Sequence, residues 1–355
     1  MGKPDNSIQT EDRRSFDTGS ISKYRNEIFG ISILAIIFFH YSEDLFMAYT
    51  AGRVSMYPFH LFKQFVLYYY EYIYSIGVEI FVFLSGMGLY YSFSKNSNLC
   101  SFYKRRFKRI LIPYIIVAAV FWSVKDFIFN GTGFLGVLED ISFYTFFKDG
   151  IRSIWFIGLI LFLYIIFPVI YHALASERNR DRWFAAILLL SYLLPIMLWY
   201  ISPRLYANIE IAATRVPVFI IGCYMGKLIK SHYRVNNIII YTSIVSCMLL
   251  KYVEVHQQWP GCIDRYADGI FALGLVLLLA VLFDLLKRAK WLIAFFSITG
   301  AYSLELYMTH VTLRNLFKEF GYSTYMFHIY ICVILFAVIL AIVLNRLCRL
   351  ISNRS

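Results

Sequence analysis

A histidine ends a long apolar stretch close to the N-terminus of the chain. The stretch RNEIFGISILAIIFFH runs from Arg25 to His40, with Glu27 near its start and twelve mostly apolar residues before the histidine. As a helix that enters a membrane at Glu27, it places His40 roughly 20 Å deep in a hydrocarbon core about 30 Å thick. An ionisable side chain at this depth indicates a functional site, although a packed histidine bonded to a neighbouring helix is equally consistent with the position.

Two other apolar stretches contain carboxylates. Glu79 lies in GVEIFVFLSG, residues 77–86, where a buried carboxylate needs a partner or must be protonated. An ion pair with an arginine or a histidine and a role in catalysis are both open for Glu79. Glu305 and His310 lie in GAYSLELYMTH, residues 300–310, and are five residues apart, so they do not share one face of a helix. One of these two can therefore be structural.

A cluster of arginines lies at the expected entrance of another helix. Arg105, Arg106 and Arg109 belong to the run KRRFKR, residues 104–109. Guanidinium groups hold phosphates through paired hydrogen bonds, and the amino end of a helix favours an anion as well. The run therefore predicts an anion site, while the plain alternative is the excess of basic residues found on the cytoplasmic side of membrane proteins.

The composition places these residues in a membrane. Of the 355 residues, 59% are hydrophobic and only 16% are charged, against about 25% charged in soluble domains. The formal charge of +12 comes from basic residues between apolar segments, which indicates membrane topology and argues against nucleic-acid binding. The six cysteines have no metal-ligand spacing, so we expect neither a disulfide nor a metal site.

The hydropathy pattern predicts an all-α polytopic membrane protein of about ten transmembrane helices, with both termini cytoplasmic. We expect residues 1–24 to form a polar, disordered cytoplasmic arm and residues 25–350 to form a single membrane-embedded domain. Outer loops are expected at 47–72, with an interfacial helix, and at 130–153. The spans are expected at 28–46, 73–93, 110–129, 154–174, 183–201, 216–229, 238–253, 270–286, 292–313 and 325–347.

Five stretches occur in an order that resembles acyltransferase family 3 of membrane proteins, over about residues 24–349. They are RNEIFGISILAIIFFH (25–40), VEIFVFLSG (78–86), FYKRRFKRILIPY (102–114), the element with Trp155, Phe156, Tyr164 and Pro168, and GAYSLELYMTH (300–310). The segment RVPVFIIGCYMG, which begins at Arg215, resembles the family's arginine segment before a helix of small residues.

The resemblance implies transfer of an acyl group, usually acetyl, from cytoplasmic acyl-CoA to a hydroxyl or amine acceptor. Acceptors of such proteins include cell-envelope polysaccharides and lipid-linked sugars. The family's first-helix histidine corresponds to His40, and its basic run to Arg105 and Arg106. The chain departs from the usual first-helix motif, because Gly30 lies in the region of the expected arginine and Arg25 lies further back. It is similar here to a polysaccharide-modifying subgroup with R-x-E-x-x-G.

These observations give one hypothesis for the reaction, in the plasma membrane. Acetyl-CoA, the acyl donor, binds from the cytoplasm, and His40 acts as general base or transient acyl carrier. Glu79, or otherwise Glu43 or Asp44, orients the imidazole as the acid of a catalytic triad does. Phosphates of the donor are expected on Arg25, Arg105, Arg106 and Arg109, and the outer acceptor on Glu43, Trp155, Arg215, Glu305 and His310.

A transporter or glycan exporter is the alternative from another class. Transporters tend to contain paired broken helices in two halves of the chain. The prolines at 113, 168, 195 and 217 show no clear pairing. Transfer of label from acyl-CoA to a glycan would separate the two classes.

Overall fold

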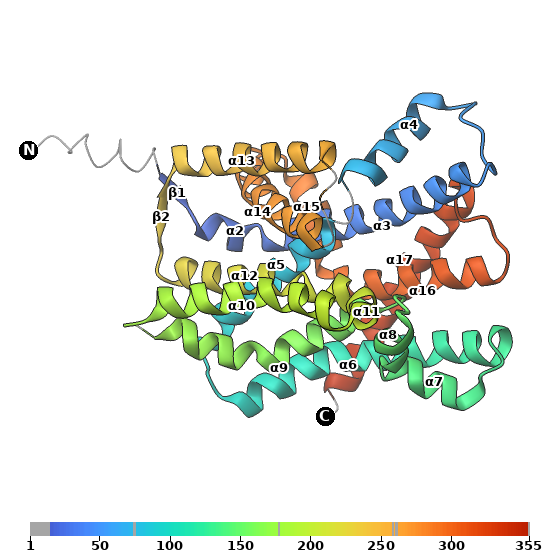
Figure 1. Cartoon of the computed structure of the whole chain (residues 1–355), viewed down its shortest axis with the longest axis horizontal. Coiled ribbons are helices and arrows are strands. Elements are labelled where there is room, and N and C mark those ends of the chain that lie inside the picture. Colours follow the sequence, from blue (N-terminus) through green and yellow to red (C-terminus); the bar gives the residue numbers. More distant parts are fainter. Residues whose placement is uncertain (1–14, 74–75, 177, 258, 260–261, 354–355) are drawn as a thin grey trace, which may run out of the picture.

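The computed structural model describes residues 15–73, 76–176, 178–257, 259 and 262–353 (Figure 1). Two short strands, β1 (Ser15–Asp17) and β2 (Arg234–Asn236), pair at one end of a bundle of helices. The helices of the first half are α2 (Gly19–Lys23), α3 (Arg25–Thr50), α4 (His60–Tyr68), η1 (Tyr69–Ile73), α5 (Ile76–Phe93), α6 (Leu99–Val124), η2 (Lys125–Phe129), α7 (Gly133–Ile141), α8 (Tyr144–Asp149) and α9 (Trp155–Ala175). Those of the second half are α10 (Arg180–Ile201), α11 (Pro203–Ala213), α12 (Val216–Lys230), α13 (Asn237–His256), α14 (Cys262–Leu285), α15 (Lys290–Ala301), α16 (Ser303–Glu319) and α17 (Phe327–Asn353).

The predicted all-α membrane architecture is confirmed. Within the described ranges, nine helices are long and apolar enough to cross a membrane, and α15 with α16 makes a tenth span that is bent by 66°. The spans of α10, α13 and α17 are the least buried, at 11%, 17% and 28%. Their exposed apolar side chains form the perimeter that lipid would cover.

The sequence predicts the basic run at a helix entrance, but in the structure the run lies inside a helix. Helix α6 begins at Leu99, where the Asn98 side chain accepts a hydrogen bond of 2.8 Å from the backbone N–H of Ser101. An asparagine cap and a run of good helix formers explain the earlier start. Arg105 to Arg109 therefore lie beyond the first turn, where the helix dipole no longer contributes to anion binding.

Segments expected to be irregular are also ordered. Residues 15–24 are not a disordered arm, because β1 pairs antiparallel with β2 and Ile21 is fully buried. The hydroxyl of Thr18 also donates to the carbonyl of Tyr233 at 2.7 Å. The rest of the expected arm, residues 1–14, lies outside the described residues. The outer loop expected at 130–153 contains the helices α7 and α8, and a further short helix, α11, precedes the sixth span. The loop expected at 47–72 contains α4, where the sequence predicts an interfacial helix.

Helix α3 packs tightly against α15 through two glycines. A Cβ atom on Gly300 would lie 1.8 Å from the carbonyl oxygen of Asn26, and one on Gly30 would lie 2.1 Å from that of Phe296. The backbones can approach this closely only because both positions lack a side chain. This contact places α3, which starts at the end of the bundle that carries β1 and β2, beside the bent span (Figure 1).

Replacement of Gly300 by Ala should destabilise the protein because the added methyl group overlaps the backbone of α3. Insertion of a carbon into a packed contact costs about 1–3 kcal/mol. Thermal unfolding of the detergent-solubilised protein measures the effect, with Ala301→Val, at an exposed position of the same helix, as control. Equal melting temperatures of the Gly300→Ala variant and the wild type would contradict the close contact.

Candidate active site

A cavity of about 180 Å³ lies between the first residues of α3, the end of α5 and the first half of α6. Its lining includes Arg25, Arg106 and Ser92, and we call it the arginine cavity. Arg106 donates a hydrogen bond of 2.7 Å to the hydroxyl of Ser92. The guanidinium of Arg25 lies 4.9 Å from the ring centroid of Phe29, and its Nε is buried without a hydrogen-bond partner among the described residues. Two positive charges thus meet at one cavity.

The other two arginines expected in the donor site lie elsewhere. Arg109 donates two hydrogen bonds to the carboxylate of Glu305, and the longer one, from Nη2 to Oε2, measures 3.2 Å. Asn345 donates to the same carboxylate at 2.9 Å. Glu305 is fully buried and neutralises Arg109. Arg105 is exposed on the surface of α6. The structure therefore brings together Arg25 and Arg106, and it separates Arg105 and Arg109 from them.

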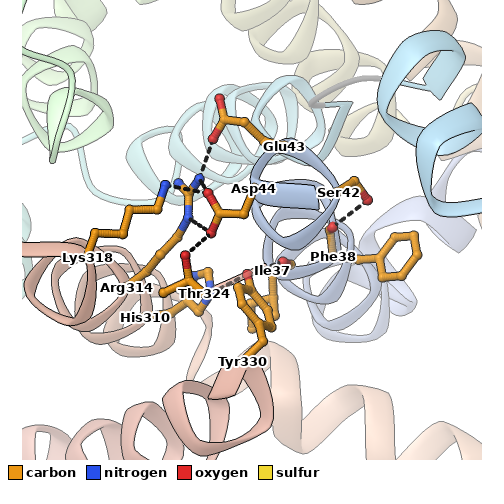
Figure 2. A network of polar contacts seen from close by, with 10 residues as sticks. All are labelled: Ile37, Phe38, Ser42, Glu43, Asp44, His310, Arg314, Lys318, Thr324 and Tyr330. Atoms are coloured by element: carbon orange, nitrogen blue, oxygen red, sulfur yellow. Dashed lines mark hydrogen bonds and ion pairs between the residues drawn. The ribbon is translucent and has the colours of Figure 1, made fainter. Parts of the chain in front are cut away.

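Two histidines stack in the bundle. The rings of His40 on α3 and His310 on α16 have centroids 5.4 Å apart and planes 21° apart. The Nε2 atom of His310 lies 2.8 Å from the hydroxyl of Tyr330, which donates to the carbonyl of Ile37 at 2.6 Å. Figure 2 shows this link from α16 through Tyr330 to α3. The Nδ1 atoms of both histidines are buried and lack a hydrogen-bond partner within the described part of the chain.

The two acids at the end of α3 are bound by an arginine (Figure 2). Arg314 donates to the carboxylate of Asp44 at 2.9 Å and to that of Glu43 at 2.6 Å. Thr324 donates to Asp44 at 2.7 Å, and Lys318 pairs with it as well. Glu43 and Asp44 are thus neutralised one helical turn beyond His40, and neither forms a hydrogen bond with its imidazole.

Glu79 does not meet His40 either, so this part of the expected geometry is wrong. Its carboxylate lies 2.6 Å from the Nη2 atom of Arg215, and both side chains are almost fully buried. Gly77 lies on the face of α5 that meets α3, because a Cβ there would lie 2.5 Å from the carbonyl oxygen of Ser32. Glu79, two residues later, lies on the other side of α5, at about 100° per residue. Ser32 is also more than two turns before His40 on α3, so the two side chains lie at different depths.

The substrate-binding residues expected at the outer mouth come together only in part. The guanidinium of Arg215 lies 5.0 Å from the ring centroid of Trp155, whose side chain is buried. Glu305 and His310 face different partners on α16, which agrees with their five-residue spacing. Tyr330 and Arg314 are residues that the sequence reasoning missed. The sequence contains one indication that Arg314 lies near the site, because it follows His310 by four residues and so shares its face of a helix.

The comparisons with known proteins identify the family. The model of the acyltransferase domain of family 3 matches residues 30–346, which is nearly the whole chain. The chain belongs to this acyltransferase family. No curated protein and no solved structure matches it. The matched region contains His40, His310 and Arg106, and it contains the ion pairs of Glu305, Asp44 and Glu79 described above. Arg25 lies just before it.

The acyltransferase has a second, very small cavity beside Trp155. Its volume of about 10 Å³ leaves room for about one water. Asp140 on α7 lines it and accepts a hydrogen bond from the hydroxyl of Thr145. Burial raises the pKa of Asp140 to about 6, the charge of nearby Asp126 adds to this rise, and the bond from Thr145 opposes it. The cavity is too small for a sugar, so the expected role of Trp155 in acceptor binding stays a prediction.

The buried ion pair between Glu79 and Arg215 makes the role of Glu79 in this acyltransferase testable. Glu79→Gln leaves the charge of Arg215 buried without a carboxylate and should cost about 3–5 kcal/mol of stability. The double variant Glu79→Gln/Arg215→Met removes both charges and should recover most of the loss. Thermal unfolding of the two variants measures this. A stable single variant that has lost activity would instead return Glu79 to the reaction.

Proposed function

We propose that the acyltransferase moves an acetyl group from cytoplasmic acetyl-CoA to a hydroxyl of a cell-envelope glycan or a lipid-linked sugar. The observation that carries this proposal is the helix α3, which has an arginine of the arginine cavity at its start and a stacked histidine further along. We place the protein in the plasma membrane, with the arginine cavity on the cytoplasmic side, because the basic residues gather there.

The arginine cavity suits the phosphates of the donor. Arg25 and Arg106 reach it from two helices, and neither forms an ion pair with a described carboxylate. Guanidinium groups bind phosphate oxygens through charge-assisted hydrogen bonds. Fifteen residues of α3 separate Arg25 from His40, which is about 22 Å along a helix. The pantetheine arm of the donor would cover that distance through the bundle, so the acyl group reaches the histidines from the cytoplasmic side.

The reaction then takes place at His40. The imidazole acts as general base on the acceptor hydroxyl or as a transient carrier of the acyl group. The oxygen of the hydroxyl forms a bond to the acyl carbon, and the carbon–sulfur bond of the thioester breaks to give the free thiol of CoA. Glu43, Asp44 and Glu79 are each paired with an arginine. We therefore propose that no carboxylate orients His40.

The transporter alternative has less support. Transporters with inverted repeats contain broken helices in both halves. Among the described residues, the pair α15 and α16 is the one that is sharply bent, and no counterpart occurs in the first half. The family match favours group transfer as well.

Replacement of His40 by Ala should abolish transfer without loss of folded protein in the membrane. A general base contributes about 10²–10⁴ to the rate, and a route through an acylated histidine cannot proceed without the histidine. The measurement is transfer of labelled acetyl from acetyl-CoA to envelope glycans by membranes with matched protein levels. Near-native transfer by the His40→Ala variant would contradict the proposed reaction centre.

Replacement of Arg106 by Ala should weaken donor binding because it removes one of the two cations of the arginine cavity. Loss of a hydrogen bond to a charged group costs about 1.5–3 kcal/mol, or about 10- to 100-fold in the apparent affinity for acetyl-CoA. Lys104→Ala removes an exposed charge from the same basic run and serves as the matched control. Equal acetyl-CoA titrations of the Arg106 and Lys104 variants would assign the arginine to membrane topology alone.

A further inference from the structure

The hydrogen bonds around Tyr330 determine where His310 carries its proton. A tyrosine hydroxyl has one hydrogen to donate, and a backbone carbonyl can only accept. Tyr330 lies 2.6 Å from the carbonyl oxygen of Ile37, so its hydrogen goes to that oxygen. The phenol oxygen then accepts from His310, whose Nε2 lies 2.8 Å away. His310 is therefore protonated on Nε2.

The other nitrogen of His310 is left as a bare acceptor. A neutral imidazole with its proton on Nε2 has a free lone pair on Nδ1. This Nδ1 atom is buried and has no hydrogen-bond partner among the residues described. A buried acceptor without a partner costs about 1–3 kcal/mol, so its presence here indicates a group that arrives with a substrate. The stacked ring of His40, 5.4 Å away, places this acceptor at the proposed reaction centre.

We propose that His310 is a second catalytic residue, the base that takes the proton of the acceptor hydroxyl on Nδ1. This inference rests on the proposed function. As the proton moves to Nδ1, the hydroxyl oxygen bonds to the acyl carbon. The bond from that carbon to its leaving atom breaks, and Nδ1 returns the proton to the leaving atom. The leaving atom is the sulfur of CoA, or a nitrogen of His40 if His40 has first carried the acyl group.

His310 and Tyr330 resemble the base and the orienting group of a catalytic triad, but the orienting group here is a hydroxyl. A base needs a group that fixes its tautomer and its orientation. In serine hydrolases that group is a carboxylate, and here it is the hydroxyl of Tyr330, which is itself held by the backbone of α3. The structure shows no hydrogen bond that would orient the imidazole of His40 in this way in the described part of the chain, whereas Nε2 of His310 is bonded to Tyr330. The structure thus assigns the base role to His310 and leaves the carrier or N–H donor role to His40.

The decisive variant is His310→Gln. The amide nitrogen of Gln reaches the position of Nε2 and keeps the bond to Tyr330, but the side chain has no basic nitrogen. We expect kcat to fall about 10²–10⁴-fold, with an unchanged KM for acetyl-CoA and an unchanged melting temperature. Tyr330→Phe removes the group that fixes the tautomer and should lower kcat less. His328→Gln, an exposed histidine on α17, is the control and should behave as the wild type.

A second measurement tests the tautomer without acyl transfer. In ¹⁵N-histidine-labelled protein in bilayers, the signals that disappear in His310→Gln belong to His310. We expect a protonated Nε2 and an unprotonated Nδ1, and a mixture of tautomers in Tyr330→Phe. A protonated Nδ1 in the wild type would overturn the inference.

The outcomes separate this inference from the function on which it rests. In one outcome the wild type transfers acetyl, His40→Ala does not, and His310→Gln keeps kcat within about tenfold of the wild type. That change is well short of the loss expected for a base. The proposed function then stands, and the role of His310 is refuted. If the wild type binds acetyl-CoA but transfers no acetyl to any glycan, the proposed function fails, and the catalytic role of His310 fails with it. Loss of kcat in His310→Gln with intact donor binding supports both.

Discussion

Charged side chains inside an apolar bundle are stable only when opposite charges meet, and this constraint determines much of the structure. Glu79 pairs with Arg215, Glu305 with Arg109, and Asp44 with Arg314, each across two helices. In Glu79–Arg215 and Asp44–Arg314 both side chains are buried. Removal of one partner from such a pair is strongly destabilising, because it leaves a charge that neither lipid nor apolar side chains can solvate. These pairs join α5 to α12, α6 to α16, and α3 to α16. Other ionisable groups lie outside these three pairs. Among them are the cations of the arginine cavity and the two stacked histidines, to which we assign binding and chemistry in the proposed reaction.

The spans could be predicted from the sequence because hydropathy is a local property, and ten apolar segments need no knowledge of their neighbours. The same holds for the place of His40 in an apolar helix. The partner of Glu79 could not be predicted in this way. An arginine partner was one of the open alternatives, but the choice depends on which face of α5 meets α3. Gly77 occupies that face because a larger residue would overlap the backbone of Ser32, and Glu79 is thereby turned toward α12.

The basic run shows a second reason why the site could not be predicted fully from the sequence. Hydropathy marks where a helix enters the apolar layer, but not where the helix begins, and α6 begins eleven residues before the expected span. Once the run is helical, its arginines point in different directions. Arg106 meets Arg25 and Ser92, Arg109 meets Glu305, and Arg105 is exposed. Neighbours in sequence therefore have different environments. The same argument explains why Tyr330 was missed, since its contact with His310 joins two helices whose relative position the sequence does not contain.

The bend between α15 and α16 completes the arrangement of the site. Helix α15 packs against the first turns of α3 through Gly30 and Gly300, and the 66° bend then directs α16 along its own path. Glu305 holds α16 to α6, and nine residues later, about 14 Å along the helix, Arg314 holds it to the end of α3. His310 lies between these two ion pairs, so its ring is positioned from both sides against His40. A reacting group must be held to within a fraction of an ångström of its productive position. Two ion pairs on one short helix, each with a buried carboxylate, provide such a constraint without taking part in the reaction.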